Sequence, residues 1–423
     1  MKFGHTSSTI KAKGVFDMLC QFTFKNFMSY RDETVFDFQA ESLHEFEDSL
    51  IRMEKCSDLL PVSVIYGPNG GGKSNLLHAL ACLISTVVNP ILQLQKSRTR
   101  FIIQDGVLCV PFKFDETSKK EPTEFQIYFR IKGYEYQYYL SLFEGKIVAE
   151  SLSRRAIGGK RPAHIFDRQD GEITLGPSLE QSGINVSVNE KMPFLSFLAI
   201  NYNIPVISDT QEWFESCFTR SYGQPDVEKI IFFSDKPESE RQIVRFMNDI
   251  GIDITGYRFD KEQAEIYMKR TIGDKTYELP FREESDGTKK LFSVLPLIMI
   301  ALQEGRLVVV DELDAKLHPK LLRYIISLFT NPEINQHGAQ LLFTSHDMST
   351  MKNTVFRRDE IWFAAQTEDK SSEIYSLYEI RQENNERVNS TAAFDKQYLE
   401  GRYGADPYLQ NMIGSDWNEP KAN

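Results

Sequence analysis

The sequence predicts an α/β fold, with strands and helices alternating along two parts of the chain. The first observation is an apolar, β-branched run at 59–65, followed by a glycine-rich turn and by leucines at helical spacing from 75 to 83. The second is an apolar run at 307–310 that ends in two carboxylates. The third is a regular succession of helix and strand patterns from 291 to 364, which is typical of a parallel sheet.

The glycine-rich turn fits G-x-x-x-x-G-K-[ST], the pattern of a phosphate-binding loop. Glycines let the backbone wrap closely around an anion, and a strand–turn–helix arrangement aims backbone N–H groups at it. Lys73 would reach the β- and γ-phosphates of a nucleotide, and the Ser74 hydroxyl would bind Mg²⁺. The alternative is a chance glycine turn. The predicted nucleotide-binding residues are Gly67, Pro68, Asn69, Gly70, Gly71, Gly72, Lys73, Ser74 and Asn75.

The apolar run at 307–310 is followed by Asp311 and Glu312. In a protein with a phosphate-binding loop, such a strand holds Mg²⁺. We expect Asp311 to bind the ion and Glu312 to act as the base that orients the attacking water. The alternative is a strand that merely ends at a polar loop. The predicted metal-binding residues are Ser74 and Asp311.

The composition limits the kind of protein. The chain has 423 residues, enough for two or three domains at roughly 150 residues each. A formal net charge of −11 argues against a surface that binds nucleic acid throughout, but it allows a local basic patch. We see no apolar run near the ~18 residues of a membrane span and no secretion signal. The five scattered cysteines are typical of reduced thiols, and we expect a cytoplasmic protein.

The first half of the chain has a strongly β pattern after an extension at 1–17 without periodicity. Alternation at 18–38 predicts two antiparallel strands. The acidic segment at 39–58 is expected to cover the glycine loop. Beyond the helix that follows this loop, aromatic-rich runs separated by glycine turns predict an antiparallel meander. Its expected strands are 107–114, 125–131, 134–143 and 146–152.

The second half begins with the least regular segment, 153–280, which we expect to be mainly helical. Its helical or buried patterns lie at 194–200, 227–233 and 241–250. From 281 the alternation becomes sharp again. The expected elements there are a helix at 291–302, a strand at 307–310, a helix at 319–329, and strands at 341–344 and 361–364.

The order of the motifs resembles ABC-type ATPases, and within them the SMC-like and OLD-like branch rather than the transporters. The glycine loop comes first, a loop at 284–288 second, the acidic pair third, and Ser-His-Asp at 345–347 last. Asn-Phe-Met-Ser at 26–29 resembles the N-terminal motif of this branch.

Two further stretches, 313–319 and 401–407, are similar to a bacterial predicted ATP/GTP-phosphatase family. That family includes ATPase subunits of anti-phage defence systems of the PARIS and RloA types. The resemblance implies a P-loop NTPase of ABC type with a mixed central sheet, an antiparallel β subdomain and an inserted, mainly helical region. The implied division is an extension at 1–17, the N-terminal half of the ATPase domain at 18–152, the insert at 153–280, and the C-terminal half at 281–423.

The resemblance also implies roles for individual residues. Ser285 and Gly287 match the signature loop, which contacts the γ-phosphate held by a partner subunit, while Asp286 stands where the family has its first glycine. The alternative is a polar helix start capped by Ser285 or Asp286. His346 matches the switch histidine that contacts the γ-phosphate, and its alternative is a structural histidine after a strand.

Two weaker matches stay open. His318 stands where SMC-like proteins carry a second aspartate, but it also precedes a proline suited to a helix start. Gln104 is a candidate for the glutamine that contacts Mg²⁺, and its alternative is a surface glutamine.

The functional hypothesis is an ATPase that uses ATP and Mg²⁺ in a head-to-tail dimer or a higher oligomer. Its expected catalytic residues are Lys73, Glu312 and His346. The ATP state would gate a partner effector, a nuclease or toxin, in bacterial anti-phage defence. The alternatives are an ATP-stabilised scaffold that sequesters a toxin with little turnover, a DNA-repair or maintenance ATPase, and a transporter subunit. Nucleic-acid binding at the basic loop 154–161 is a weaker hypothesis than a solvated loop.

Overall fold

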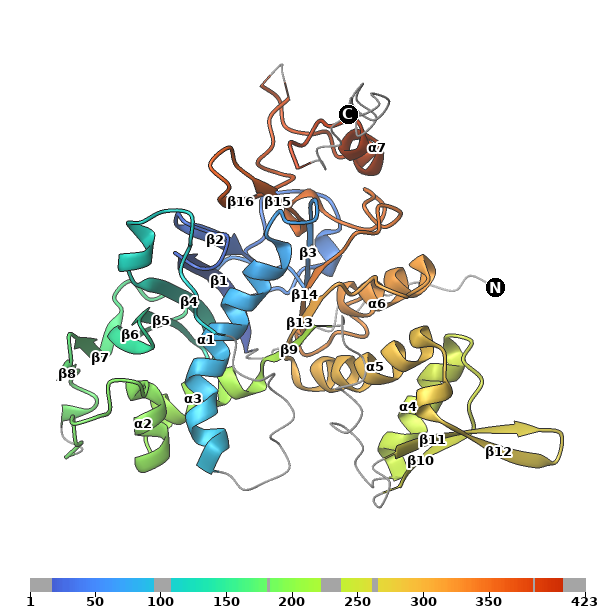
Figure 1. The fold of residues 1–423 in the computed structure, drawn as a ribbon, viewed down its shortest axis with the longest axis horizontal. Helices are drawn as coiled ribbons and strands as arrows, with labels where there is room; N and C mark the ends of the chain where they lie inside the picture. Colours follow the sequence, from blue (N-terminus) through green and yellow to red (C-terminus); the bar gives the residue numbers. More distant parts are fainter. Residues whose placement is uncertain are drawn as a thin grey trace, which may run out of the picture.

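The structure, a computed structural model, describes residues 17–94, 108–180, 183–221, 237–260, 265–382 and 385–405. These residues form three β-sheets, of seven, six and three strands. The expected extension at 1–16, the pattern at 227–233 and Gln104 lie outside the described residues. Figure 1 shows the six-stranded sheet in the middle of the molecule, with elements packed on both sides of it.

The six-stranded sheet is mostly parallel. In spatial order its strands are β16 (Ser372–Ser376), β15 (Ile361–Gln366), β3 (Val62–Tyr66), β14 (Gln340–Thr344), β13 (Leu307–Asp311) and β9 (Phe218–Ser221). All neighbouring pairs are parallel except β15 with β16. The residues that follow β3, β13 and β14 therefore meet at one edge of the sheet, as expected for parallel strands.

The seven-stranded sheet is antiparallel throughout. Its spatial order is β2 (Thr34–Asp37), β1 (Met18–Lys25), β4 (Thr123–Ile131), β5 (Tyr134–Phe143), β6 (Lys146–Ala156), β7 (Ala163–Gln169) and β8 (Glu172–Leu175). The first two strands form the antiparallel pair predicted at 18–38. The strands from β4 to β8 form the predicted meander, which continues for two strands beyond the expected range.

Two apolar cores lie on opposite faces of the six-stranded sheet. Leu307 and Val309 of β13 belong to the core shared with the seven-stranded sheet, while the alternating Val308 and Val310 belong to the other. Both faces are thus buried, which explains why the sequence shows a continuous apolar run here. The helices of the first core are α1 (Lys73–Leu94), α2 (Phe194–Asn201) and α3 (Pro205–Ser216), and those of the second are α4 (Pro237–Asp249), α5 (Asp286–Glu304), α6 (Pro319–Thr330) and α7 (Phe394–Leu399).

The segment 153–280 is not mainly helical, so this expectation was wrong. Its described residues contain three helices, α2 to α4, but also six strands, β7 to β12. The last three form a separate sheet of β10 (Gly256–Asp260), β11 (Glu265–Ile272) and β12 (Lys275–Pro280). Charged residues paired across the strands, such as Arg258 with Glu278 at 2.7 Å, interrupt the apolar alternation that would have indicated a sheet.

The expected strand at 107–114 is also absent from the described residues of that range. Their backbone groups bind the N-terminal motif instead of a neighbouring strand. The N–H of Met28 donates to the carbonyl of Val110 at 2.7 Å, and the N–H of Phe112 donates to Asn26 Oδ1 at 2.9 Å. A side chain that accepts a backbone N–H can replace a strand ladder, and the apolar alternation alone does not reveal this.

The acidic segment at 39–58 does not cover the glycine loop. It packs where the chain enters β3 and β15, since the N–H of Leu60 donates to Phe38 O at 2.8 Å and that of Glu41 donates to Asp359 Oδ2 at 2.8 Å. The glycine loop follows the opposite end of β3. This segment therefore packs against the end of the sheet where β3 and β15 begin, opposite the glycine loop.

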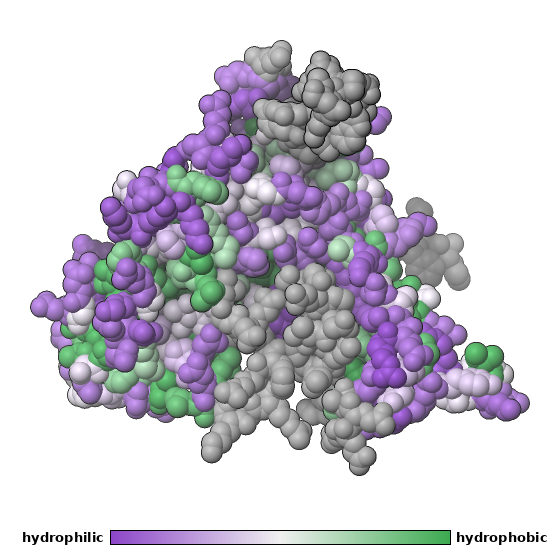
Figure 2. All heavy atoms as spheres, in the orientation of Figure 1, coloured by the Kyte–Doolittle hydropathy of each residue, from purple (hydrophilic) through white to green (hydrophobic). Residues whose placement is uncertain are grey.

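Helix α1 is more apolar than the sequence analysis recognised. It is the one described helix long and apolar enough for a membrane span, with a mean hydropathy of 1.6 over an 18-residue window. Within the fold, 61% of that window is buried, as in a core helix. The visible surface is mostly hydrophilic, with apolar side chains in separate patches (Figure 2).

A buried carboxyl group near β15 makes the stability depend on pH. Burial raises the pKa of Glu360 from 4.5 to about 8, the charges of Asp359 and Glu45 add to this, and Arg357 opposes it. The folded state therefore keeps a proton that the unfolded state releases between these two values. This contribution to stability is complete below about pH 4.5 and is lost as the pH rises towards 8.

We expect the free energy of unfolding to fall through this window, by on the order of 1 kcal/mol per pH unit from this one group. Glu360→Gln should flatten the profile, because an amide stays neutral and keeps an oxygen that can accept the N–H of Arg357. Urea unfolding at several pH values measures it, with the exposed Glu368→Gln as the control. Parallel profiles for wild type and Glu360→Gln would contradict the prediction.

Candidate active site

The glycine loop connects β3 to α1 and packs tightly against β15. Gly67 has a φ of +144°, and a Cβ there would lie 2.2 Å from the carbonyl oxygen of Ala364. Gly72 has a φ of +107°, and a Cβ there would lie 2.5 Å from the Ser372 hydroxyl. Both positions thus require glycine for conformation and for space.

Lys73 begins α1 and is 6% exposed. Its ammonium donates to the carbonyls of Gly67 at 2.8 Å and Pro68 at 3.0 Å, so the side chain folds back over its own loop. Burial lowers the pKa of Lys73, while the negative charges of Asp311, Glu312 and Asp314 oppose this. The Lys73 ammonium is therefore held by two carbonyl oxygens of its own loop, in a region that also contains the three carboxylates.

The glycine loop and the acidic pair meet directly. Ser74 Oγ donates to Asp311 Oδ1 at 3.1 Å, across 237 positions of sequence. Thr344 Oγ1, at the end of β14, donates to the same carboxylate oxygen at 2.6 Å. Asp311 is 8% exposed. The parallel edge of the sheet thus places the two predicted metal-binding residues in contact.

Glu312 follows Asp311 in an unusual conformation. Its φ is +51°, in the left-handed region that residues other than glycine rarely occupy. Its N–H donates to Thr344 Oγ1 at 2.7 Å, and its carbonyl accepts a bond from Lys290 Nζ at 2.6 Å. The backbone is therefore fixed on both sides of the Cα, which sets the direction of the carboxylate.

His346 follows β14 at the same edge, and its side chain is exposed. Its N–H donates to Asp314 Oδ2 at 3.0 Å. The other oxygen of Asp314, Oδ1, is buried and has no hydrogen-bond partner among the described residues. The structure thus places His346 beside the loop that follows the acidic pair, with its imidazole towards solvent.

Ser285 and Gly287 lie at the start of α5. Ser285 caps the helix, because its Oγ accepts the N–H of Thr288 at 3.2 Å. Asp286 pairs with Lys316 at 2.7 Å. Among the described residues, no hydrogen bond joins this loop to the glycine loop. The capping alternative is therefore present in the structure.

The remaining predicted positions differ in outcome. Asn75 donates through its amide to Ser29 Oγ at 2.8 Å, so its side chain holds the N-terminal motif against α1. His318 Nδ1 accepts the N–H of Lys320 at 3.2 Å and caps α6, which favours the structural alternative. Pro68, Asn69, Gly70 and Gly71 lie in the glycine loop itself.

Several residues at the site were missed by the sequence analysis. The Tyr30 hydroxyl donates to Gly72 O at 3.2 Å, and the Ser372 hydroxyl donates to Ser29 Oγ at 2.8 Å. Thr344 and Lys290 hold the acidic pair, as described above. Of these, only Thr344 had a signal, as the polar end of an apolar strand next to the Ser-His-Asp triplet.

The donor atoms fit a magnesium ion that arrives with a nucleotide. A hydroxyl and a carboxylate are hard oxygen ligands, and Mg²⁺ in nucleotide sites takes its other ligands from phosphates and water. No cluster of three or more histidines, cysteines or carboxylates that could hold a metal occurs in the described part of the chain. The site therefore fits an ion that the protein and a nucleotide bind together better than an ion that the protein binds alone.

The comparisons with known proteins agree with this architecture. A family model described as "AAA domain, putative AbiEii toxin, Type IV TA system" matches residues 62–352, more than half of the chain. The chain belongs to this AAA family. The matched range contains the glycine loop, the signature-like loop, the acidic pair and His346. Membership of this AAA family confirms the predicted P-loop NTPase fold.

The chain of this AAA family is also similar to two solved structures. One is an Smc head bound to the C-terminal winged-helix domain of ScpA, with 13% identity, a TM-score of 0.39, and 85% of this chain and 97% of that chain covered. The other is an Smc head domain with a coiled coil and joint derived from Pyrococcus yayanosii, with 11% identity, a TM-score of 0.43, and 91% and 99% covered. No curated protein matches the chain.

Proposed function

We propose that the protein binds ATP with Mg²⁺ in the cytoplasm and hydrolyses it, and that the ATP state gates a partner effector. The observation that carries the proposal is the contact of Ser74 with Asp311 at 3.1 Å. It joins the two halves of a nucleotide site that lie far apart in sequence. Membership of an AAA family supports the same chemistry.

The residues have separable tasks in this mechanism. Magnesium, when bound to Ser74 and Asp311, would neutralise charge on the phosphates. The Lys73 ammonium would turn from the carbonyls of its own loop to the phosphates. Glu312 would accept a hydrogen bond from the attacking water and orient it. His346 would donate to the γ-phosphate side from the end of β14.

Asp311→Asn tests the metal site. We expect phosphate release by the wild type to require Mg²⁺, and the variant to need about tenfold more Mg²⁺ for half-maximal rate or to lose the rate, since an amide carries no charge to hold the ion. Asp274→Asn, an exposed aspartate in the β11–β12 turn, is the matched control. Equal Mg²⁺ dependence in Asp311→Asn and wild type would contradict the proposed site.

The proposal includes a head-to-tail dimer. No hydrogen bond between described residues of one chain joins the loop of Ser285 and Gly287 to the glycine loop, and the charges of a bound triphosphate need donors from more than one side. A second subunit that presents this loop would supply them. Light scattering with and without ATP tests this dimer. The Glu312→Gln variant, which should bind ATP without hydrolysing it, is expected to dimerise with ATP. A monomeric mass for this variant in the presence of ATP would contradict the dimer.

The effector would be a nuclease or a toxin of an anti-phage system. The support is the toxin–antitoxin description of the matching family, together with the absence of a second catalytic motif from the sequence patterns recognised above. Co-purification of the full-length protein with its genomic neighbours, with and without ATP, would identify the effector. A partner whose retention never changes with nucleotide would argue against gating.

One observation favours the scaffold alternative. The signature-like loop is engaged within its own chain, where Ser285 Oγ bonds Thr288 and Asp286 bonds Lys316. A loop held this way would hinder contact with a second nucleotide and slow turnover. In that case ATP would stabilise an assembly around a toxin without regular hydrolysis.

Nucleic-acid binding has less support. Arg155 pairs with Glu135, and the Arg154 guanidinium lies 4.3 Å from the centre of the Tyr134 ring. Arg154 and Arg155, two of the three arginines at 154–161, therefore have partners in the antiparallel sheet. Charge reversal of these two residues that leaves DNA retention and its salt dependence unchanged would remove the hypothesis.

A further inference from the structure

Lys290 is a buried lysine that the chemistry proposed above does not use. It lies on α5 within two turns of Ser285 and is 3% exposed. Its ammonium donates to the carbonyl of Glu312 at 2.6 Å and to that of Ala315 at 2.7 Å. A lysine is among the costliest side chains to bury, so a position that served packing alone would favour an apolar residue.

The turn that Lys290 holds is strained at both ends. Glu312 has a φ of +51° and Lys316 a φ of +62°. Each such conformation is unfavourable for a residue other than glycine. The Ala315 N–H closes the turn by donating to the Glu312 carbonyl at 3.1 Å. The same carbonyl accepts the Lys290 ammonium, so the lysine locks the turn in this form.

We propose that Lys290 is a positioning residue for hydrolysis. It holds the backbone of Glu312, and hence the direction of its carboxylate, and it ties this backbone to the first turns of α5. Ser285 and Gly287 stand at the start of that helix. When the nucleotide of a second subunit contacts Ser285 and Gly287, the effect would therefore be transmitted to Glu312 of the same chain through α5 and the Lys290 ammonium. The inference rests on the proposed function.

Kinetics of Lys290→Met test the inference, because methionine keeps the length and apolar stem but cannot donate. We expect kcat to fall about tenfold or more, with KM and the affinity for a fluorescent ATP analogue within about twofold of wild type. Lys290→Arg should recover most of kcat, since a guanidinium can donate to both carbonyls. Lys289→Met is the matched control, as Lys289 donates to Arg282 O at 3.0 Å and touches neither carbonyl of the turn.

Hydrogen exchange gives a second readout that does not need turnover. The amides of Ala315 and Leu317, which bond within the turn, should exchange about tenfold faster in Lys290→Met than in Lys289→Met. If the methionine variant does not fold, Lys290→Gln, which is too short to reach both carbonyls, replaces it.

The outcomes separate the two proposals. A folded Lys290→Met with wild-type kcat, or with unchanged exchange in 312–317, overturns the positioning role. A raised KM with unchanged kcat also overturns it. Wild-type protein that releases no phosphate sinks the proposed function instead, and the exchange result then decides alone whether Lys290 holds the turn.

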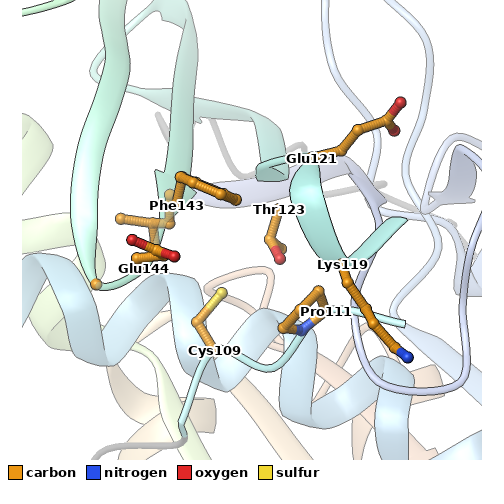
Figure 3. Close-up of a pocket in the computed structure, with 9 residues that line it drawn as sticks. Cys109, Pro111, Lys119, Glu121, Thr123, Phe143 and Glu144 are labelled. Carbon is orange, nitrogen blue, oxygen red and sulfur yellow. The ribbon is translucent and has the colours of Figure 1, made fainter. Parts of the chain in front are cut away.

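A different observation concerns two cysteines beside a surface pocket. Cys109 lines this pocket and points towards its centre, opposite Phe143 and Thr123 (Figure 3). Cys82, on α1, is 1% exposed and belongs to the apolar core against which Cys109 packs, with the two thiols in side-chain hydrogen-bond contact. Both are free thiols. One sulfur is thus open to small solutes, and the other is protected behind it.

The surroundings favour the reactive form of Cys109. The hydrogen bond from Cys82 lowers the pKa of the Cys109 thiol, Thr123 adds to this, and burial opposes it. The thiolate is the form that attacks oxidants. A partly exposed thiolate next to a second thiol is the arrangement that redox-sensitive cysteines share.

We infer that Cys82 and Cys109 form an oxidation site for hydrogen peroxide. The Cys109 thiolate attacks the terminal peroxide oxygen, the O–O bond breaks, and the leaving hydroxide takes a proton to become water. The resulting sulfenic acid is attacked by the Cys82 sulfur, the S–O bond breaks, and a second water leaves with the Cys82 proton. The two thiols lose two electrons in total, and the peroxide gains them.

A disulfide here would fix a contact near the nucleotide site. Residues 110 and 112 bind the N-terminal motif through Met28 and Asn26. The same motif contacts the glycine loop through Tyr30. The bond would thus tie α1 to the segment that supports this motif.

Peptide mass analysis after treatment with hydrogen peroxide tests the site. Trypsin can cleave at Lys96, Arg98 and Arg100, between the two cysteines. We expect a peptide pair linked through Cys82 and Cys109 that dithiothreitol separates. Cys56→Ser should still form it, and Cys82→Ser should instead accumulate oxidised Cys109. Peroxide that modifies Cys56 while the pair stays unlinked, or linkage only in unfolded protein, would overturn the inference.

Discussion

Glu312→Gln should lower the rate of ATP hydrolysis by about a hundredfold or more while the protein still binds ATP. Glutamine keeps the size and the hydrogen-bonding oxygen of the side chain but cannot accept a proton from water. The backbone bonds of this residue to Thr344 and Lys290 do not involve the side chain, so the fold should be preserved. Steady-state phosphate release and binding of a fluorescent ATP analogue measure the two effects separately.

Glu333→Gln is the matched control, because Glu333 is exposed in the turn after α6, at the opposite edge of the sheet. Its rate should equal that of the wild type. With ATP, Glu312→Gln should also accumulate as the dimer that light scattering detects. A variant that releases phosphate as fast as the wild type would remove Glu312 from the mechanism, and with it the present assignment of the acidic pair.

Lys73→Ala should lose affinity for ATP by on the order of a hundredfold. The Lys73 ammonium is the cation of the glycine loop, and its charge interacts with the carboxylates of Asp311 and Glu312. Without it, the phosphates would face those carboxylates with less compensation, and the carbonyls of Gly67 and Pro68 would lose their donor. Isothermal titration with a non-hydrolysable ATP analogue measures the loss.

Lys146→Ala, an exposed lysine paired with Glu190 on the antiparallel sheet, should bind ATP like the wild type. An unchanged affinity in Lys73→Ala would contradict the site. A comparison of Lys73→Ala with Glu312→Gln also distinguishes gating by ATP hydrolysis from the ATP-stabilised scaffold. If Lys73→Ala loses the effector, while Glu312→Gln keeps it and still releases it on stimulation, then ATP binding alone is the switch.

The parts of the site that were predictable from sequence are those where one local rule decides. Strand, glycine loop and helix follow each other at 62–94 because the loop needs glycine and both neighbours are strongly apolar. The apolar run at 307–310 predicted a buried strand, and the two carboxylates that follow it predicted a metal-binding end. Parallel order then implies that these segments meet.

The parts that were not predictable depend on partners distant in the chain. Lys290 looks like any lysine on a helix, and only the fold shows that its ammonium reaches the carbonyls after β13. The apolar alternation at 107–114 suggested a strand, but Asn26 competes for its backbone. In 256–280, charged pairs replaced the apolar pattern of a sheet. In these cases the deciding interaction spans between 20 and 86 positions of sequence.

The strand order of the six-stranded sheet also determines when the proposed nucleotide site can form during synthesis. β3 pairs with β14 and β15, which are synthesised almost three hundred residues later. The Leu19 N–H donates to the Gln340 side chain, 321 positions further along the chain. The antiparallel sheet, in contrast, has nearly all its partners within the first 175 residues. A chain still emerging from the ribosome can therefore complete that sheet early, whereas slow, long-range pairing completes the parallel one last. A chain interrupted before β14 has the glycine loop and β13 but lacks the strand that joins β13 to β3, so the proposed nucleotide site would form only after β14 is made.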